Sequence, residues 1–434
     1  MDLFYVGILG VLILLFFLFV VGIPVGFAMA IVGFLGFSYV VDVQAALGIL
    51  GTDIWNTFSS YGFTVIPLFI FMGFLSFNTG IAERLYKAAY IWFGSWSGGL
   101  AIATIGACEL FGAICGSNTA TAATMGTVAL PQMKKYHYDP GLGAGVVATG
   151  GTLGTIMPPS VVLIIIALQT EQSIVKLFVA SIIPALVMGA LLVATIYVLC
   201  RIKPQLGPAG PKTTFREKIK ALSTVAEALG IFVLVLGGLF IGIFTPTEAG
   251  AMGVFFTFCV ALIGKGITKK SLISSFSNTL KISCMVFMLV TGAIIFGRFL
   301  AVTRIPFELA DTIAGLPVPN YIILACIIVI YLIGGCFMDS LGFLVLTIPI
   351  FFPLGAKLGY DPIWFSVILT IVTTLGAVTP PVGVNIYVVK ALAPEIPIVT
   401  IFKNVSFFIA ACIVSMAILF FFPDLVLVLP NMVK

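Results

Sequence analysis

Two short stretches decide how this sequence is interpreted: "GTIMPPS" at residues 154–160 and "GAVTPPV" at residues 376–382. Each interrupts a long apolar run with two adjacent prolines. Proline has no backbone N–H and its ring clashes with the preceding helical turn, so each pair ends a helix and frees carbonyl groups. Within a membrane, free carbonyl groups must face protein, water or an ion. Both stretches therefore predict broken helices with a possible binding role.

The composition places these breaks in a membrane. Of the 434 residues, 61% are hydrophobic and only 9% are charged, which excludes an ordinary water-exposed domain. Apolar runs long enough to cross a bilayer as helices recur along the chain, and they lack the polar-apolar alternation of barrel strands. The first run starts near Met1 without a cleavage site, which indicates a retained membrane helix. We expect an all-α, multi-pass integral membrane protein.

The two halves of the sequence match at an offset of 222 residues without a gap. The residues of the first half that are identical in the second are Pro131, Lys135, Tyr138, Asp139, Pro140, Thr152, Leu153, Gly154, Pro158 and Pro159. Short or broken apolar segments at corresponding places in two halves are typical of secondary transporters. The match therefore predicts two structural repeats, which we expect to be inverted.

Each repeat is expected to contain a re-entrant helical hairpin and a helix broken at Pro-Pro. The boundaries are 1–200 for the first repeat (hairpin about 116–135, broken helix about 140–168), 201–222 for a basic loop, and 223–434 for the second repeat (hairpin about 338–357, broken helix about 361–390). The loop is rich in Lys and Arg, so the positive-inside rule makes it cytoplasmic. Amphipathic stretches at 80–93 and 304–317 are expected along the membrane interface.

Oxygen groups, most of them uncharged, gather at both breaks and at the polar stretch before each. The candidate residues are Ser117, Asn118, Gly151, Thr152, Thr155 and Pro158 in the first half, and Asp339, Thr373, Thr374, Gly376, Thr379 and Asn385 in the second. Such oxygens suit Na⁺ better than a transition metal. The alternative is structural, because Ser and Thr hydrogen-bond within membrane helices and Gly permits close helix packing.

Charged residues inside apolar runs are the second signal, because the bilayer disfavours them. Asp339 could bind a cation or a substrate hydroxyl, or it could cap the helix that follows it. Arg298 could attract an anionic substrate, or its guanidinium could reach the interface. We interpret Glu109 and Glu248 as structural residues that cap a helix or pair with a lysine.

These features together resemble a known family. The paired breaks, the stretch "GSNTATAATMGTVALPQM" at 116–133 and the stretch "GIFTPTEAGAMG" at 242–253 look like the large membrane subunit of tripartite ATP-independent periplasmic (TRAP) transporters. The resemblance spans essentially the whole chain. It implies an elevator mechanism, in which a transport domain with both hairpins moves through a scaffold in the bacterial inner membrane.

The resemblance also implies ligands and partners. It points to two or more Na⁺ ions and to a small organic acid of the sialic acid or C4-dicarboxylate type. Sodium would be bound by the candidate residues named above other than Asn385, and substrate by Asn118, Asp339, Arg298 and Asn385. The implied partners are a small four-helix membrane subunit on a separate chain, a periplasmic binding protein and membrane lipid, with no nucleic acid.

Two other function classes remain as alternatives at this point. A passive anion channel could also use broken helices, and a Na⁺/carboxylate symporter could work without a binding protein. A membrane enzyme is not expected. Asp139 and Asp361 lie in turns, which leaves Asp339 without a second intramembrane aspartate, and His137 is the only histidine.

Overall fold

In the computed structural model, which describes residues 3–78, 80–263 and 267–433, the regular secondary structure is helical. The helices of the first half are α1 (Leu3–Phe16), α2 (Val25–Val40), α3 (Val43–Ser59), α4 (Val65–Asn78), α5 (Ile81–Phe93), α6 (Gly99–Cys115), α7 (Asn118–Lys135), α8 (Pro140–Ile156), α9 (Val161–Gln169) and α10 (Ile174–Ile202). Those of the second half are α11 (Phe215–Thr224), α12 (Ala226–Phe240), α13 (Pro246–Ile263), α14 (Lys269–Val302), α15 (Ile305–Ala314), α16 (Asn320–Phe337), α17 (Ser340–Lys357), α18 (Pro362–Gly376), α19 (Val384–Leu392), α20 (Ile398–Phe421) and α21 (Asp424–Leu427).

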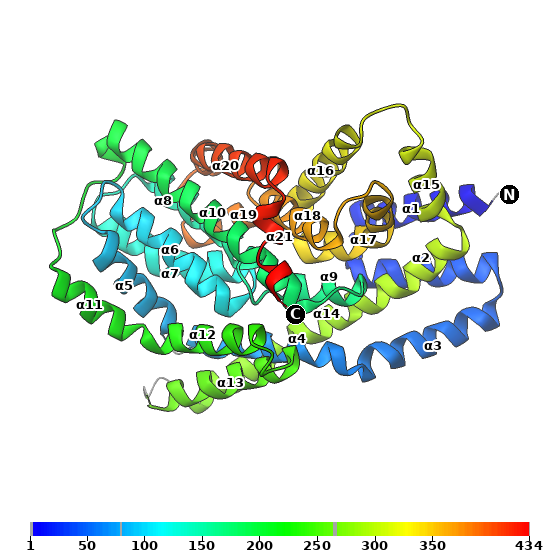
Figure 1. Ribbon diagram of the computed structural model, residues 1–434, viewed down its shortest axis with the longest axis horizontal. Helices are drawn as coiled ribbons and strands as arrows, with labels where there is room; N and C mark the ends of the chain where they lie inside the picture. Colours follow the sequence, from blue (N-terminus) through cyan, green and yellow to red (C-terminus); the bar gives the residue numbers. More distant parts are fainter. Residues whose placement is uncertain (1–2, 79, 264–266, 434) are drawn as a thin grey trace.

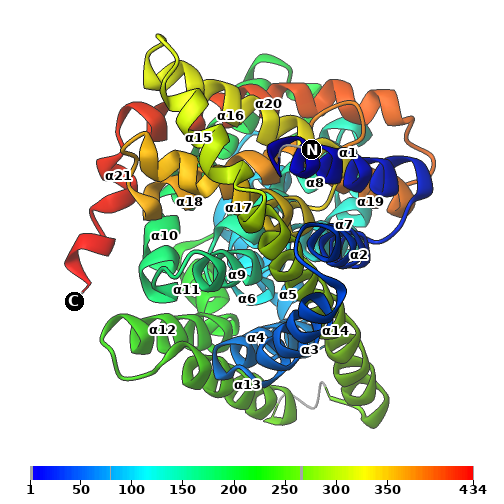
Figure 2. The ribbon, with the colours of Figure 1, turned by 90° about the vertical axis from the view of Figure 1, so that its right-hand side faces the viewer.

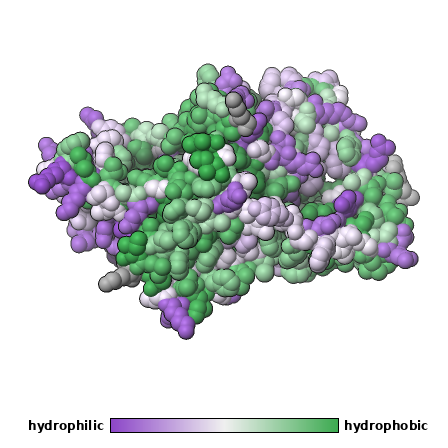
Figure 3. All heavy atoms as spheres, turned by 60° about the horizontal axis from the view of Figure 1, so that its bottom comes forward, coloured by the Kyte–Doolittle hydropathy of each residue, from purple (hydrophilic) through white to green (hydrophobic). Residues whose placement is uncertain are grey.

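Many of these helices can cross a bilayer. In the described residues, eight are long and apolar enough to do so, and the number reaches ten if each of two bent pairs forms one span. Hydrophobic side chains cover much of the face shown in Figure 3. Large hydrophobic side chains such as Trp55 and Phe255 are exposed. Apolar side chains on the outside of a folded chain indicate contact with lipid or with another membrane subunit. The all-helical membrane fold is confirmed.

Helix boundaries follow the 222-residue spacing found in the sequence. Helices α7 and α17 are offset by 222 residues at both ends, and α6, α8 and α9 have counterparts in α16, α18 and α19. The halves differ at one place: α14 is a single helix of 34 residues, whereas the matching part of the first half is divided into α3 and a segment containing α4, bent by 51°. The repeat is therefore visible in the helices and is not perfect.

The helices form two groups, as two views at right angles show. Helices α3, α4, α12, α13 and α14 lie along one side of the molecule, at the bottom of Figure 1 and Figure 2. Helices α6–α8 and α16–α20 lie above them. Within the first group, α4 packs against both α13 and α14. The second group contains both Pro-Pro breaks.

Two helical hairpins occupy the second group. The base of the α6–α7 hairpin is closed where the Leu100 N–H donates to the Tyr138 hydroxyl at 3.1 Å. The base of the α16–α17 hairpin is closed where Asn320 Nδ2 donates to the Leu358 carbonyl at 3.1 Å. Each chain segment therefore enters and leaves on the same side. The predicted ranges 116–135 and 338–357 correspond to the tip and second arm of each hairpin, and α6 and α16 form the first arms.

The short helix that follows each Pro-Pro break packs against the other half of the protein. After its break, α9 packs against α17 and α18, and α19 packs against α7 and α8. Each hairpin is thus supported by the helix that follows the break in the other half. Breaking both helices in mid-course makes this exchange possible, because the chain can change direction there.

The segment 201–222 differs from the predicted loop, because residues 215–222 belong to α11. The Thr214 side chain and Glu217 form a capping box that starts this helix. This pattern predicts a helix start, although the basic composition of the segment favours a loop. The remainder crosses the base of the first hairpin, where the Gly98 N–H donates to the Gly207 carbonyl at 2.9 Å and the Tyr138 hydroxyl to Pro208 at 2.8 Å. Burial raises the pKa of Tyr138 to about 12, so its hydroxyl stays a donor at physiological pH.

Candidate functional site

The tips of both hairpins are helix starts fixed by their own side chains. The Ala120 N–H donates to Ser117 Oγ at 3.4 Å, and the Leu341 N–H donates to Asp339 Oδ2 at 3.1 Å. Gly116 before the first tip has φ +64°, and a Cβ there would lie 2.9 Å from the Pro159 carbonyl oxygen. Both helices α7 and α17 therefore begin, with their positive dipole ends, at the centre of the molecule.

The two tips touch. Asn118 Nδ2 donates to Ser340 Oγ at 3.4 Å, and these residues are separated by the 222-residue repeat spacing. The two tips therefore meet at corresponding positions of the two halves. The bases of the hairpins lie at opposite ends of the molecule, with α6 and α7 on the left of Figure 1 and α16 and α17 on the right.

A cavity of about 540 Å³ adjoins the tips. The hairpin side is lined by Ser117, Asn118, Thr119, Thr155, Asp339 and Ser340, and the opposite wall by Phe74 and Phe77 of α4 and by Ile282, Met285 and Val286 of α14. Among the described lining residues, Asp339 is the only charged side chain. The cavity thus has a polar wall from the two hairpins and an apolar wall from the other helix group, and it is large enough for a small organic molecule.

The first break removes the usual helical donors of two carbonyl oxygens. The carbonyl groups of Gly154 and Thr155 would accept hydrogen bonds from residues 158 and 159, and both of these are prolines without an N–H. A Cβ on Gly154 would lie 2.7 Å from the Ser117 carbonyl oxygen and would clash with Thr121 Oγ1. Thr121 Oγ1 is buried without an oxygen or nitrogen partner in the described residues. Backbone and hydroxyl oxygens therefore converge between α7 and α8.

The second break has the same prolines and a different hydrogen-bond pattern. The Thr379 N–H donates to the Gly376 carbonyl at 2.9 Å, and the Asn385 N–H donates to the Ala377 carbonyl at 2.9 Å. The loop packs against the end of α16, where a Cβ on Gly376 would lie 2.6 Å from the Gly335 Cα. Turn hydrogen bonds thus satisfy the carbonyl groups of Gly376 and Ala377. Their counterparts at the first break, Gly154 and Thr155, have prolines in place of their helical donors.

Several of the predicted hydroxyl ligands donate to their own helices, as the structural alternative expects. The donations are Thr152 to Thr149, Thr373 to Leu369, Thr374 to Thr370 and Thr379 to Leu375, with oxygen–oxygen distances of 2.6–2.8 Å. A hydroxyl group that donates still keeps lone pairs for a cation. These threonines, Gly151, Pro158 and Gly376 do not line the cavity, whereas Thr155 does.

Asn385 lies behind the first hairpin. Its Nδ2 donates to the Ala148 carbonyl of α8 at 3.1 Å, and a Cβ on Gly151 would lie 3.1 Å from that nitrogen. The side chain is buried, and Oδ1 has no hydrogen-bond partner in the described residues. Asn385 therefore joins α19 to α8 beside the first break, and it does not line the cavity.

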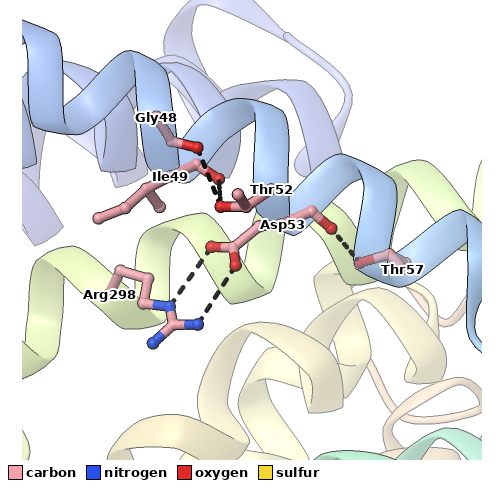
Figure 4. A network of polar contacts seen from close by, with 6 residues as sticks. All are labelled: Gly48, Ile49, Thr52, Asp53, Thr57 and Arg298. Carbon is pink, nitrogen blue, oxygen red and sulfur yellow. Dashed lines mark hydrogen bonds and ion pairs between the residues drawn. The ribbon is translucent and has the colours of Figure 1, made fainter.

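Arg298 is not at the hairpin tips. Its Nε and Nη2 donate to the two carboxylate oxygens of Asp53 at 3.3 and 3.2 Å, which joins α14 to α3 (Figure 4). Asp53 is buried, and the Thr57 hydroxyl donates to its backbone carbonyl at 2.8 Å. The arginine thus pairs with a carboxylate between two helices of the group opposite the hairpins, and it is not among the residues that line the cavity. Its role in substrate binding stays a prediction.

Comparison with known proteins shows the family of this chain. Residues 12–425 match the family described as "Tripartite ATP-independent periplasmic transporter, DctM component". The chain belongs to the DctM family. As a TRAP large permease, it is a multi-pass membrane component of a transporter and not an enzyme.

Named relatives of this DctM chain serve different substrates. The C4-dicarboxylate TRAP transporter large permease protein DctM of Pseudomonas aeruginosa is 33% identical over 88% of this chain and 89% of its own length. The sialic acid TRAP transporter large permease protein SiaM of Vibrio cholerae is 29% identical over 95% of each protein. The isethionate TRAP transporter permease protein DctMQ of Oleidesulfovibrio alaskensis is 33% identical over 90% of this chain and 61% of its own length.

A solved structure shares the fold of the DctM chain. The YdaH transporter of Alcanivorax borkumensis superposes with a TM-score of 0.59 over 87% of this chain and 88% of that one, at 14% sequence identity. At this identity the likeness concerns the fold alone.

Proposed function

We propose that this permease imports a small organic acid together with Na⁺ across the bacterial inner membrane, by an elevator movement of the helix group that carries both hairpins. The observation that carries the proposal is the position of the cavity, between the two hairpin tips and helices α4 and α14. A substrate held there touches a unit containing both tips on one side and the other helix group on the opposite side. Sliding of one group past the other would then move the substrate across the membrane.

An inverted arrangement of the repeats supports alternating access. The hairpin bases lie at opposite ends of the molecule while the tips meet. The base of the first hairpin adjoins the basic segment 201–222 through the Gly98–Gly207 and Tyr138–Pro208 hydrogen bonds. By the positive-inside rule that end faces the cytoplasm, so the first hairpin enters from the cytoplasm and the second from the periplasm.

Sodium would occupy the oxygen-rich regions at the breaks. The carbonyl groups of Gly154 and Thr155 lack their usual helical donors, because residues 158 and 159 are prolines. With the Thr121 hydroxyl and the Ser117 carbonyl nearby, they offer the hard oxygen ligands that Na⁺ prefers. In the second half, Asp339 supplies the negative charge, and the residues from 373 to 379 supply oxygens. We infer two or more sodium ions, at least one beside each break.

Bound cations would also offset the negative charge that an anionic substrate meets in the cavity. The charged side chain in its described lining is the carboxylate of Asp339, which repels a substrate carboxylate. The starts of α7 and α17 contribute only partial positive charge. Bound Na⁺ would therefore supply the positive charge that Arg298, paired elsewhere, does not supply.

The partners and substrate class follow from the relatives. We infer a small membrane subunit, a periplasmic binding protein that delivers the substrate, and contact with lipid over the apolar surface. The relatives named for C4-dicarboxylate, sialic acid and isethionate indicate an organic acid.

Uptake into proteoliposomes tests the proposal. The permease is reconstituted with its small subunit, and uptake of candidate acids is measured with and without a Na⁺ gradient and the binding protein. Asp339→Asn keeps an acceptor for the Leu341 N–H and loses the charge, so the apparent Na⁺ affinity should fall by roughly 10- to 100-fold. Asp361→Asn, which caps α18 outside the cavity, is the matched control and should behave like wild type.

Other outcomes distinguish the alternatives. Uptake that ignores both Na⁺ and the binding protein would indicate a passive channel. Uptake that requires Na⁺ and not the binding protein would indicate an independent symporter. Unchanged Na⁺ affinity in Asp339→Asn would remove Asp339 from the sodium site.

A further inference from the structure

Glu109 is an acidic residue deep in the first hairpin, away from the cavity. It lies ten residues after the start of α6 at Gly99, about 15 Å along the helix from the hairpin base. Its carboxyl group lies against Gly189 in the middle of α10, where a Cβ would be 2.6 Å from Oε2 and 3.0 Å from Oε1. Only a glycine at position 189 leaves room for the carboxyl group in this position. The structure therefore shows a carboxyl group seated in a slot between two membrane helices.

The slot contains no counter-charge. Oε1 is buried without a hydrogen-bond partner, and none of the ion pairs of the described residues includes Glu109. The two interpretations made from the sequence are both wrong for this residue, since Glu109 lies in mid-helix and has no lysine partner. Glu248, by contrast, accepts from the Thr245 N–H at 2.8 Å and caps α13 as expected.

The charged groups on the helices around α6 are engaged elsewhere or distant. Helices α4 and α8 contain no charged residue. On α5 and α7, Arg84 pairs with Glu227, Lys87 with Glu83, and Lys134 with Glu395, and Lys135 lies over the Tyr136 ring. On α10, Lys176 and Arg201 are 13 and 12 residues from Gly189, which is about 18–20 Å along the helix. On α6 itself, the titratable residue next to Glu109 is Cys108.

The surroundings of the slot are apolar. Leu186, one turn before Gly189 on α10, is exposed on the outside of the molecule, and Leu110 beside Glu109 is partly exposed. Apolar surroundings disfavour the charged form of a carboxyl group without a partner. The protonated form is neutral and can also donate a hydrogen bond.

We infer that Glu109 is a proton-binding site of the first hairpin, occupied in the conformation described here, and that transport slows when the proton is lost. The ligand is H⁺, and the site is separate from the oxygen groups proposed to bind Na⁺. The part concerning transport rests on the proposed function, whereas proton occupancy does not. A charged Glu109 would place an unpaired carboxylate between two helices, in apolar surroundings, within the hairpin that is proposed to move.

Infrared spectroscopy of the purified full-length permease tests occupancy without any substrate. At neutral pH the wild-type protein should show the carbonyl stretch of a protonated carboxylic acid, shifted in D₂O. Glu109→Gln, which copies the shape of the neutral acid, should lose this band. Glu308→Gln, at an exposed position on α15, should keep it. A band that is absent from the wild type, or that survives in Glu109→Gln, overturns the inference even if transport occurs as proposed.

Uptake tests the functional part. Wild-type uptake should decline at alkaline pH, by about tenfold per pH unit once the site has titrated, whereas Glu109→Gln should not show this decline. Glu109→Asp, which keeps the acid, should retain a pH-dependent decline and also serves if the glutamine variant does not fold. The same pH profile in wild type and Glu109→Gln overturns the role in transport. If no acid is taken up by any variant, the proposed function fails while the infrared result still decides proton occupancy.

Discussion

At the scale of single residues, the Asp53–Arg298 ion pair is a contact that the sequence did not reveal. Both charges lie in otherwise apolar runs, one in each half, and the sequence predicts a role only for the arginine. The positions 222 residues away are Ser275 and Ser76, and near this second contact Ser275 Oγ donates to the Phe74 carbonyl at 3.2 Å. The ion pair thus occupies a helix contact that is uncharged in the other half. A comparison of each charged residue with the residue 222 positions away could have indicated that Asp53 and Arg298 form an ion pair.

The pair should be energetically asymmetric. The Asp53 side chain is 5% exposed and that of Arg298 is 57% exposed. Arg298→Met leaves a buried carboxylate unpaired and should destabilise the protein by about 3–5 kcal/mol. Asp53→Asn leaves a guanidinium that can reach lipid headgroups or water, so it should lower the thermal unfolding temperature less.

Thermal unfolding of the purified variants measures this difference. Lys134→Met, which removes the exposed pair with Glu395, is the control and should change stability by about 0–1 kcal/mol. A larger loss for Asp53→Asn than for Arg298→Met would contradict the asymmetry.

At the scale of elements, glycines set how closely the hairpin and the broken helix approach. A Cβ on Gly112 of α6 would lie 2.5 Å from the Gly154 Cα of α8. Gly112→Ala should therefore force α6 and α8 apart, lower the unfolding temperature and reduce uptake. Gly106 lies on the same helix with open space around its Cβ position. Gly106→Ala should be neutral or stabilising by up to about 1 kcal/mol, because alanine favours the helix.

The comparison between these two variants is the decisive measurement for this packing. Equal effects on unfolding temperature and uptake would mean that the contact between α6 and α8 is unimportant. A loss in Gly106→Ala alone would indicate that the exposed face of α6 contacts another subunit.

The elements were largely predictable from the sequence, and their contacts were not. Two prolines end a helix in any context, so the breaks at 154–160 and 376–382 follow from local chemistry. Which carbonyl groups stay free depends on turns formed across the loop, and these differ between the two breaks. The apolar cavity wall from α4 and α14 left no signal, because Phe74 and Met285 resemble ordinary lipid-facing residues in a sequence.

At the scale of the whole molecule, the proposed elevator movement predicts which distances change. Ala123 of α7 and Met285 of α14 line the cavity from opposite helix groups, and Asn320 and Leu358 lie within one group. In a background without the eight native cysteines, cross-linking Ala123→Cys to Met285→Cys should abolish uptake. Cross-linking Asn320→Cys to Leu358→Cys should leave most uptake intact.

Uptake before and after cross-linking, followed by reduction, measures this. Full uptake with the first pair cross-linked would show that the two groups do not slide past each other. Reduction should restore uptake by the first pair, which separates cross-linking from damage caused by the substitutions.

The contact between Asn118 and Ser340 has a consequence for the evolution of charge at the centre of the protein. Two identical halves around a two-fold axis can place only an even number of carboxylates there, because every residue appears twice. Once both halves are in one polypeptide, each can mutate alone, and here Ser117 lines the cavity from one half and Asp339 from the other. A single chain with two different halves can therefore carry an odd number of charges at its centre. A homodimer of identical halves could not place a single negative charge beside the cavity, because each chain would contribute one.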